Sequence, residues 1–121
     1  MKVAINTCFG GFGLSEPAFE KLLERKGIAF EKEDGESKFI GASYYKEGMC
    51  GDAEGYLAQY EFYEDRSDSD LIAVIEEFKE ASNSWAADIA IVEIPDDVEW
   101  YIHEYDGMEH VAEKHRTWYG D

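Results

Sequence analysis

The dipeptide Asp106-Gly107 constrains the fold more than any other feature, because residues of alternating polarity flank it on both sides. A two-residue Asp-Gly loop favours a type I′ turn and is a strong short-range signal for a β-hairpin. We therefore predict antiparallel strands over 98–105 and 108–116. A helical spacing of apolar residues from 108 onward competes with this reading, but the turn outweighs it.

The turn also determines which residues of the hairpin lie opposite each other. His103 pairs with His110, and Glu104 faces Glu109, which is unfavourable unless solvent or a cation relieves the repulsion. The face that we expect to cover the core carries Val98, Trp100, Ile102 and Val111. The opposite face carries Tyr101, His103, Tyr105, Met108, His110 and Ala112.

A run of glycines separates a predicted N-terminal strand from the first predicted helix. The strand covers 2–8, and Gly10-Gly11-Phe12-Gly13 ends it. Ser15 is an N-cap candidate for an amphipathic helix over 16–26, and Gly27 follows the end of that helix.

A second helix and a second apolar strand follow in the C-terminal half. The run Ser67-Asp68-Ser69-Asp70 is a helix-start signal, and helical spacing continues to Ala81. Residues 88–94 read as a buried strand. Between the two helices we expect an extended stretch at 28–30, a polar turn at 32–37 and a short strand at 38–42.

Residues 43–66 fit this pattern least well and are predicted to be an irregular excursion rich in tyrosine and glycine. They hold five of the eight tyrosines, and 56–63 alternates as a strand with an aromatic face would. This composition is typical of a protein interface and equally of a locally packed aromatic cluster. The candidate partner-binding residues are Tyr44, Tyr45, Tyr56, Tyr60 and Tyr63.

Together these elements predict one α+β domain over 1–121. We expect a mixed or antiparallel sheet of about four or five strands, with two helices on one face and a C-terminal β-hairpin.

Net charge is the main functional signal in the sequence. The chain has 28 acidic and 11 basic residues, which gives a formal net charge of −17. Residues 1–30 are close to neutral, so the acidic excess lies in 31–121. Such a field repels nucleic acid and anionic membranes and attracts basic protein surfaces. We expect no direct nucleic-acid or membrane binding, although solubility alone is a competing explanation for the charge.

The compartment is inferred from apolar runs and cysteines. The sequence contains no run of about 18 apolar residues, so we predict no membrane span. Residues 1–6 lead into a strand pattern and lack the apolar core of a signal peptide. We therefore expect a cytoplasmic protein in which Cys8 and Cys50 are thiols. Two cysteines without a CxxC pair argue against structural zinc.

Of all segments, the loop from Cys8 to Ser15 has the pattern most typical of a ligand-binding or catalytic site. A cysteine after a strand, followed by glycines and a helix start, can face an anion. However, Leu14 stands where a tyrosine-phosphatase loop needs arginine, and the Walker and dinucleotide patterns are incomplete. Three interpretations remain. The loop is a tight turn with positive φ whose Phe9 and Phe12 pack on the sheet, or it is an anion or nucleotide site, or Cys8 is a nucleophile. The residues of the binding candidate are Cys8, Gly10, Gly11, Phe12, Gly13 and Ser15.

Metal and cofactor sites are not expected. His103 and His110 could hold zinc or nickel, but the neighbouring glutamates point to the other face of a regular hairpin. We therefore interpret His103 and His110 as an exposed pair without a metal. His115 is expected to have a structural role. We therefore assign no metal site, no cofactor and no catalytic residue.

Three parts of the chain resemble a family of small phage and prophage proteins that has no established activity. They are the start Lys2-Val-Ala-Ile-Asn-Thr-Cys-Phe-Gly-Gly-Phe-Gly-Leu-Ser15, the segment 70–77, and the C-terminal motifs 94–100, 105–107 and Glu113-Lys-His-Arg-Thr-Trp118. Residues 31–65 carry no resemblance. The resemblance implies a phage setting, and hence the cytoplasm of the host cell, but little chemistry.

Three functions follow as hypotheses. The first is an acidic phage accessory protein that binds and inhibits a basic host protein, such as a nucleic-acid-handling or antiviral-defence enzyme. The second is a sponge for a nucleotide-like small molecule at Gly10–Ser15, and the third is an enzyme that depends on Cys8. The sequence leaves the oligomeric state open.

Overall fold

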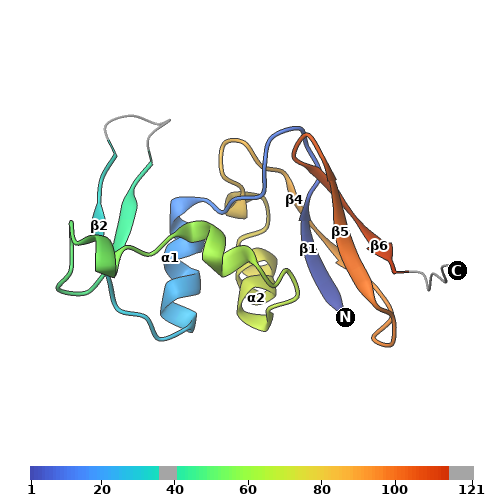
Figure 1. Cartoon of the computed structure of the whole chain (residues 1–121), viewed down its shortest axis with the longest axis horizontal. Coiled ribbons are helices and arrows are strands. Elements are labelled where there is room, and N and C mark those ends of the chain that lie inside the picture. The colour runs from blue at the N-terminus through green and yellow to red at the C-terminus, as the bar shows by residue number, and fades with distance from the viewer. Residues whose placement is uncertain (36–40, 115–121) are drawn as a thin grey trace, which may run out of the picture.

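The computed structural model describes residues 1–35 and 41–114, which fold into an α+β structure (Figure 1). In chain order the elements are β1 (Lys2–Asn6), α1 (Glu16–Arg25), β2 (Phe30–Glu33), β3 (Ser43–Lys46), the 3₁₀ turns η1 (Ala53–Gly55) and η2 (Gln59–Tyr63), α2 (Ser69–Phe78), the 3₁₀ turn η3 (Lys79–Ser82), β4 (Ile89–Glu93), β5 (Trp100–Tyr105) and β6 (Met108–Glu113).

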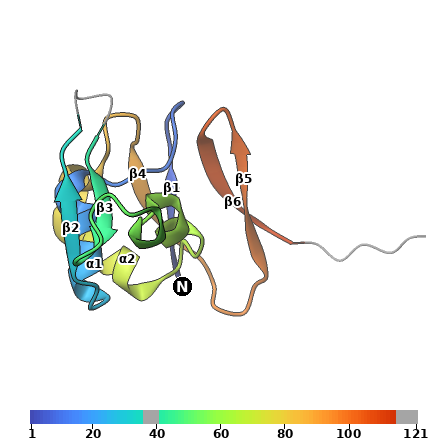
Figure 2. The same cartoon turned by 60° about the vertical axis from the view of Figure 1, so that its left-hand side comes forward.

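The strands of the described residues form three antiparallel pairs, β1–β4, β2–β3 and β5–β6. The expectation of one sheet of four or five strands is therefore wrong, whereas the α+β class and the C-terminal hairpin are confirmed. The two helices lie between the β2–β3 pair on one side and the β1–β4 pair on the other (Figures 1 and 2). The β5–β6 hairpin lies beyond β1 (Figure 2).

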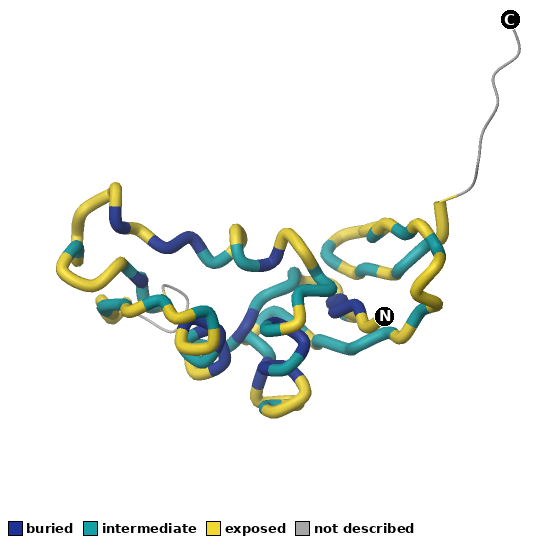
Figure 3. The backbone as a smooth tube through the Cα atoms, turned by 90° about the horizontal axis from the view of Figure 1, so that it is seen from below, coloured by how far each residue is buried: buried dark blue, intermediate teal, exposed yellow. Residues whose placement is uncertain are grey.

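The apolar core joins residues of α1, α2 and β1, and Tyr44, Leu57 and Tyr63 extend it. Figure 3 shows the buried residues in dark blue. Phe19 and Leu22 of α1 and Leu71 and Val74 of α2 are completely buried. These positions follow the helical spacing seen in the sequence, which places one apolar stripe of each helix against the other. Truncating one such leucine to alanine typically costs about 2–5 kcal/mol.

Helix α1 begins and ends where the sequence predicts. The Ser15 side chain accepts a hydrogen bond from the Ala18 N–H and caps the helix. Gly27 follows the helix with φ +73°, and the Ile28 N–H donates to the Leu23 carbonyl. This is the αL ending that glycine favours because it has no Cβ.

The C-terminal hairpin has the predicted turn and register, but β5 begins at Trp100 and β6 ends at Glu113, so both strands are shorter than predicted. Residues 115–116 of the predicted strand, and with them His115, lie outside the described residues. Asp106 and Gly107 have φ values of 53° and 87°, as a type I′ turn requires. His103 lies opposite His110, and Glu104 opposite Glu109. The face expected to cover the core is only partly covered, because Trp100 and the other apolar residues on it are half-buried.

The outer edge of β1 explains why the hairpin does not join a larger sheet. The Ala4 N–H donates to the Arg66 carbonyl at 2.9 Å, and the Asn6 N–H donates to Glu109 Oε1 at 2.8 Å. A loop carbonyl and a carboxylate thus take the bonds that a neighbouring strand would take. Strand β6 lies beside β1, but contributes a side chain there instead of a backbone ladder.

The segment between the helices differs most from the prediction. Residues 56–63 do not form a strand, because 59–63 are the 3₁₀ turn η2. Strand β2 extends to Glu33, into the predicted turn at 32–37. The predicted strand at 38–42 lies partly outside the described residues, and 41–42 have no regular structure.

Helix α2 is shorter than the predicted span to Ala81. It ends at Phe78, Lys79 has φ +54°, and the chain continues as η3. In the part of the chain that the structure describes, neither helix combines the length and apolarity needed to cross a bilayer.

Candidate functional site

The glycines of the loop after β1 allow close packing. A Cβ on Gly10 would lie 1.9 Å from the Ala86 carbonyl oxygen, and one on Gly13 would lie 2.9 Å from Ser84 Oγ. None of Gly10, Gly11 and Gly13 has a positive φ, so the expectation of a left-handed turn is wrong. The loop instead crosses the 84–86 segment at a distance that only glycine permits.

The donors at the start of α1 are largely occupied, which weakens the anion-site reading. Ser15 Oγ accepts from the Ala18 N–H and donates to the Ala81 carbonyl, while Pro17 has no N–H. Glu16 already places a carboxylate at this helix end. The Ala42 N–H and then Lys32 bind this carboxylate, and they hold the pKa of Glu16 below its usual value although burial opposes the shift.

Phe12 is packed, whereas Phe9 is not. The Phe12 ring meets Tyr63 edge-on, with 5.0 Å between ring centroids, and Arg66 lies 3.9 Å above the Phe12 ring. Phe9 is 68% exposed, so the expectation that it packs on the sheet is wrong.

Cys8 lies among hydrogen-bond acceptors. Its Sγ is 3.4 Å from both Asn6 Oδ1 and the Ala86 carbonyl oxygen. The thiol can donate to one of these oxygens. Among the described residues, no histidine or cation is a hydrogen-bond partner of Cys8, so these contacts lend no support to a nucleophile.

The five tyrosines of 43–66 divide into core and surface. Tyr44 and Tyr63 are buried: Tyr44 donates to Glu20 Oε2 at 2.9 Å, and Tyr63 to Gln59 Oε1 at 3.0 Å. These two cannot contact a partner, so this part of the interface hypothesis does not fit the structure. Tyr45, Tyr56 and Tyr60 remain accessible, and Tyr45 packs edge-on against Tyr56.

A buried polar network at β1 has no counterpart in the sequence predictions. Arg66 forms a bidentate pair with Glu109, with N–O distances of 2.6 and 2.9 Å, and the two side chains are only 15% and 8% exposed. The guanidinium also donates to the Tyr63 carbonyl, which fixes its orientation. The one available signal was the pairing of Glu104 with Glu109, which is unfavourable unless solvent or a cation relieves the repulsion.

Asn6 extends this network to the hairpin turn. Its side-chain amide donates to the carbonyls of Cys8 and Gly107, and its Oδ1 accepts from the Asp88 N–H. The side chain is completely buried. With its donors and acceptor satisfied, Asn6 holds the β1 end, the 84–88 loop and the hairpin turn together.

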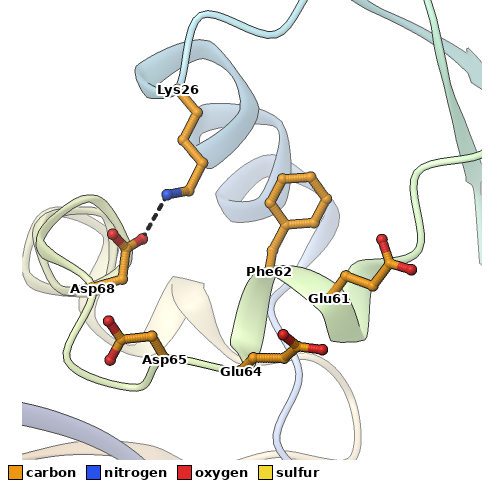
Figure 4. A pocket seen from close by; sticks show the side chains of 6 residues that line it. All are labelled: Lys26, Glu61, Phe62, Glu64, Asp65 and Asp68. Carbon is orange, nitrogen blue, oxygen red and sulfur yellow. Dashed lines mark ion pairs between the residues drawn. The ribbon is translucent and has the colours of Figure 1, made fainter.

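An acidic hollow lies between the C-terminal end of α1, η2 and the start of α2 (Figure 4). It has a volume of about 350 Å³, and we call it the acidic hollow throughout. Its lining consists of Lys26, Glu61, Phe62, Glu64, Asp65 and Asp68. Four of these six residues are carboxylates, and the Phe62 ring provides an apolar wall.

Lys26 is the only cation among the described residues that line the acidic hollow, and carboxylates of α2 and its N-cap neutralise it. Lys26 Nζ lies 2.8 Å from Asp68 Oδ2 and 3.6 Å from Asp70 Oδ2. Partial burial alone would lower the pKa of Lys26, but the hydrogen bond and charge of Asp68, with Asp70, raise it. This pairing places a cation at a helix C-terminus and anions at a helix N-terminus, as the helix dipoles favour.

The remaining carboxylates of the acidic hollow are not compensated. Among the described residues, Glu61, Glu64 and Asp65 have no ion-pair partner, and all three are exposed. The Asp65 carboxylate accepts hydrogen bonds from the Ser67 N–H and hydroxyl. The acidic hollow thus combines excess negative charge with an apolar wall, which suits the alkyl stem and charged head of lysine or arginine.

A second hollow of about 350 Å³ adjoins the start of α1. Ser15 is the only residue of the predicted loop site that lines it, together with residues such as Glu16, Gln59 and Asn83. The glycines and Cys8 are not among its lining residues. This hollow therefore does not bring the predicted loop residues together.

A scan against protein-family models, a search of curated proteins and a search of solved structures found no match to this chain. The phage resemblance therefore stays an expectation.

Proposed function

We propose that this chain is a binding protein that docks the acidic hollow against a basic surface of a protein partner. The observation that carries this proposal is the cluster of three uncompensated carboxylates, Glu61, Glu64 and Asp65, beside the Phe62 ring. A lysine or arginine of the partner would place its alkyl stem on the ring and its charge among the carboxylates.

The charge of the whole chain supports the same partner class. At −17, the long-range field accelerates encounter with a basic surface, and the local contacts of the acidic hollow then select the docked orientation. In the phage setting that the sequence resemblance implies, the partner would be a basic host enzyme that handles nucleic acid or mediates defence. Covering its basic groove would inhibit it.

A triple variant tests the proposal in capture from bacterial lysate. Glu61→Gln, Glu64→Gln and Asp65→Asn remove three charges and retain side-chain size. The matched control, Asp97→Asn with Glu99→Gln and Glu113→Gln, removes the same charge at exposed sites that do not line the acidic hollow. The wild type and the control should retain a common basic protein that the hollow variant loses.

Salt supplies the second arm of this experiment. Retention should fall as ionic strength rises from about 0.05 to 0.5 M, because exposed charge pairs are screened over that range. Equal capture by the two triple variants, or capture that ignores salt, would remove the support for the acidic hollow as the docking site.

A further inference from the structure

The outer face of the β5–β6 hairpin carries two histidines in direct opposition. His103 and His110 are cross-strand partners, and their ring centroids lie 4.8 Å apart with the planes tilted by 38°. Both residues are exposed. In the described part of the chain, no hydrogen bond involves either ring, so their nitrogens have no competing protein partner there.

The separation of the rings matches that of two imidazoles on one metal ion. With a metal–nitrogen distance of about 2.0–2.1 Å, each ring centre lies about 3.2 Å from the ion. Two such rings would have centres about 4.5 Å apart for a right-angled pair and about 5.2 Å apart for a tetrahedral pair. The observed 4.8 Å lies between these values.

The hairpin holds this pair in place without help from the rings. The type I′ turn at Asp106-Gly107 sets the register, and the Arg66–Glu109 pair holds β6 against the rest of the protein. Little conformational freedom of the backbone is therefore lost when an ion binds, which is the advantage of a preorganised chelate. The chain's negative field also raises the local concentration of cations.

We propose that His103 and His110 form a two-imidazole chelate for a divalent first-row transition metal such as Ni²⁺, Cu²⁺ or Zn²⁺. Imidazole is a preferred ligand of these ions. Glu104 and Glu109 do not complete the site: they lie on the other hairpin face, and Arg66 occupies Glu109. No cluster of three potential ligands occurs among the described residues, so the remaining coordination positions are open to water or to a donor from another molecule.

The test is a calorimetric titration of the full chain, without an added histidine tag, with Ni²⁺. Wild type should bind one ion, and His103→Gln or His110→Gln should each weaken binding about 100-fold, because a single imidazole lacks the effective concentration of a chelate. Both substitutions are at exposed positions, and circular dichroism checks that the variants remain folded.

Two control variants keep the result specific. His115→Gln removes the third histidine, and Cys50→Ser removes an exposed thiol that could also bind nickel. Both should bind Ni²⁺ as the wild type does, and Ni²⁺ should raise the melting temperature of the wild type but not of His103→Gln. Undiminished binding by either hairpin variant, or loss of binding in a control, would overturn the chelate.

Discussion

Two groups of carboxylates in this molecule have the same chemistry and opposite surroundings. Glu109 is nearly buried, and its two oxygens are bound by Arg66 and by the Asn6 N–H. Glu61 and Glu64 of the acidic hollow are exposed, and no described residue forms an ion pair with them. The net charge of the chain therefore combines two kinds of carboxylate. Some are paired inside the protein and stabilise the fold, and others are exposed and unpaired, so that they can bind a partner.

The difference has an energetic consequence. A buried charge whose partner is removed keeps its desolvation cost, whereas an exposed charge in water costs little to remove. Substitutions at the Arg66–Glu109 pair should therefore change stability, and substitutions in the acidic hollow should change binding.

The largest effect is expected for Glu109→Ala. It leaves the Arg66 guanidinium and the Asn6 N–H without their acceptor, so we expect a loss of about 3–5 kcal/mol in the free energy of unfolding. Urea denaturation measures this loss. Glu113→Ala, on the same face but exposed, should cost less than about 0.5 kcal/mol; similar losses in both variants would contradict a structural role specific to Glu109.

Two neighbouring glycines provide the next comparison. Gly10→Ala places a Cβ 1.9 Å from the Ala86 carbonyl oxygen, whereas a Cβ on Gly11 meets nothing within 4 Å. We expect Gly10→Ala to cost about 1–3 kcal/mol and Gly11→Ala to be nearly neutral. Thermal unfolding distinguishes the two, and equal behaviour of the variants would refute close packing as the reason for the glycine at position 10.

A smaller effect is expected at alkaline pH. Burial raises the pKa of Tyr63 to about 12, whereas an unfolded tyrosine titrates near pH 10. The folded state therefore keeps its proton between these values, and stability falls as pH rises through this window. At about pH 11 the contribution of Tyr63 to the free energy of unfolding should be about 1 kcal/mol smaller than at neutral pH.

Urea denaturation at pH 8 and pH 11 measures this loss. The phenylalanine of Tyr63→Phe has no proton to lose. The difference in free energy of unfolding between this variant and the wild type should therefore be smaller at pH 11 than at pH 8. If this difference is the same at both pH values, the phenol does not titrate differently on folding.

The elements that could be predicted from the sequence rest on local chemistry. The Asp106-Gly107 turn determined the register of the hairpin, and Ser15 and Gly27 marked the ends of α1 because caps and αL endings depend on adjacent residues. The Arg66–Glu109 pair joins residues distant in sequence, so no spacing revealed it.

The aromatic segment illustrates what composition cannot decide. Tyr44 and Tyr60 look alike in the sequence, yet Tyr44 is buried against Phe19 and Tyr60 is 69% exposed. The difference arises because β3 packs on α1, a contact that composition does not encode. The acidic hollow was missed for the same reason, since three separate elements bring its residues together.

The most direct test of the division between the two carboxylate groups is an NMR titration of the ¹⁵N-labelled chain with a hexa-arginine peptide. We predict that amide shifts concentrate at Lys26 and 61–68, that Asn6 and Glu109 do not respond, and that neutralising Glu61, Glu64 and Asp65 abolishes the shifts without lowering stability. Shifts spread evenly over all acidic segments, or shifts that persist in the neutralised variant, would contradict the acidic hollow as the site where a basic partner binds.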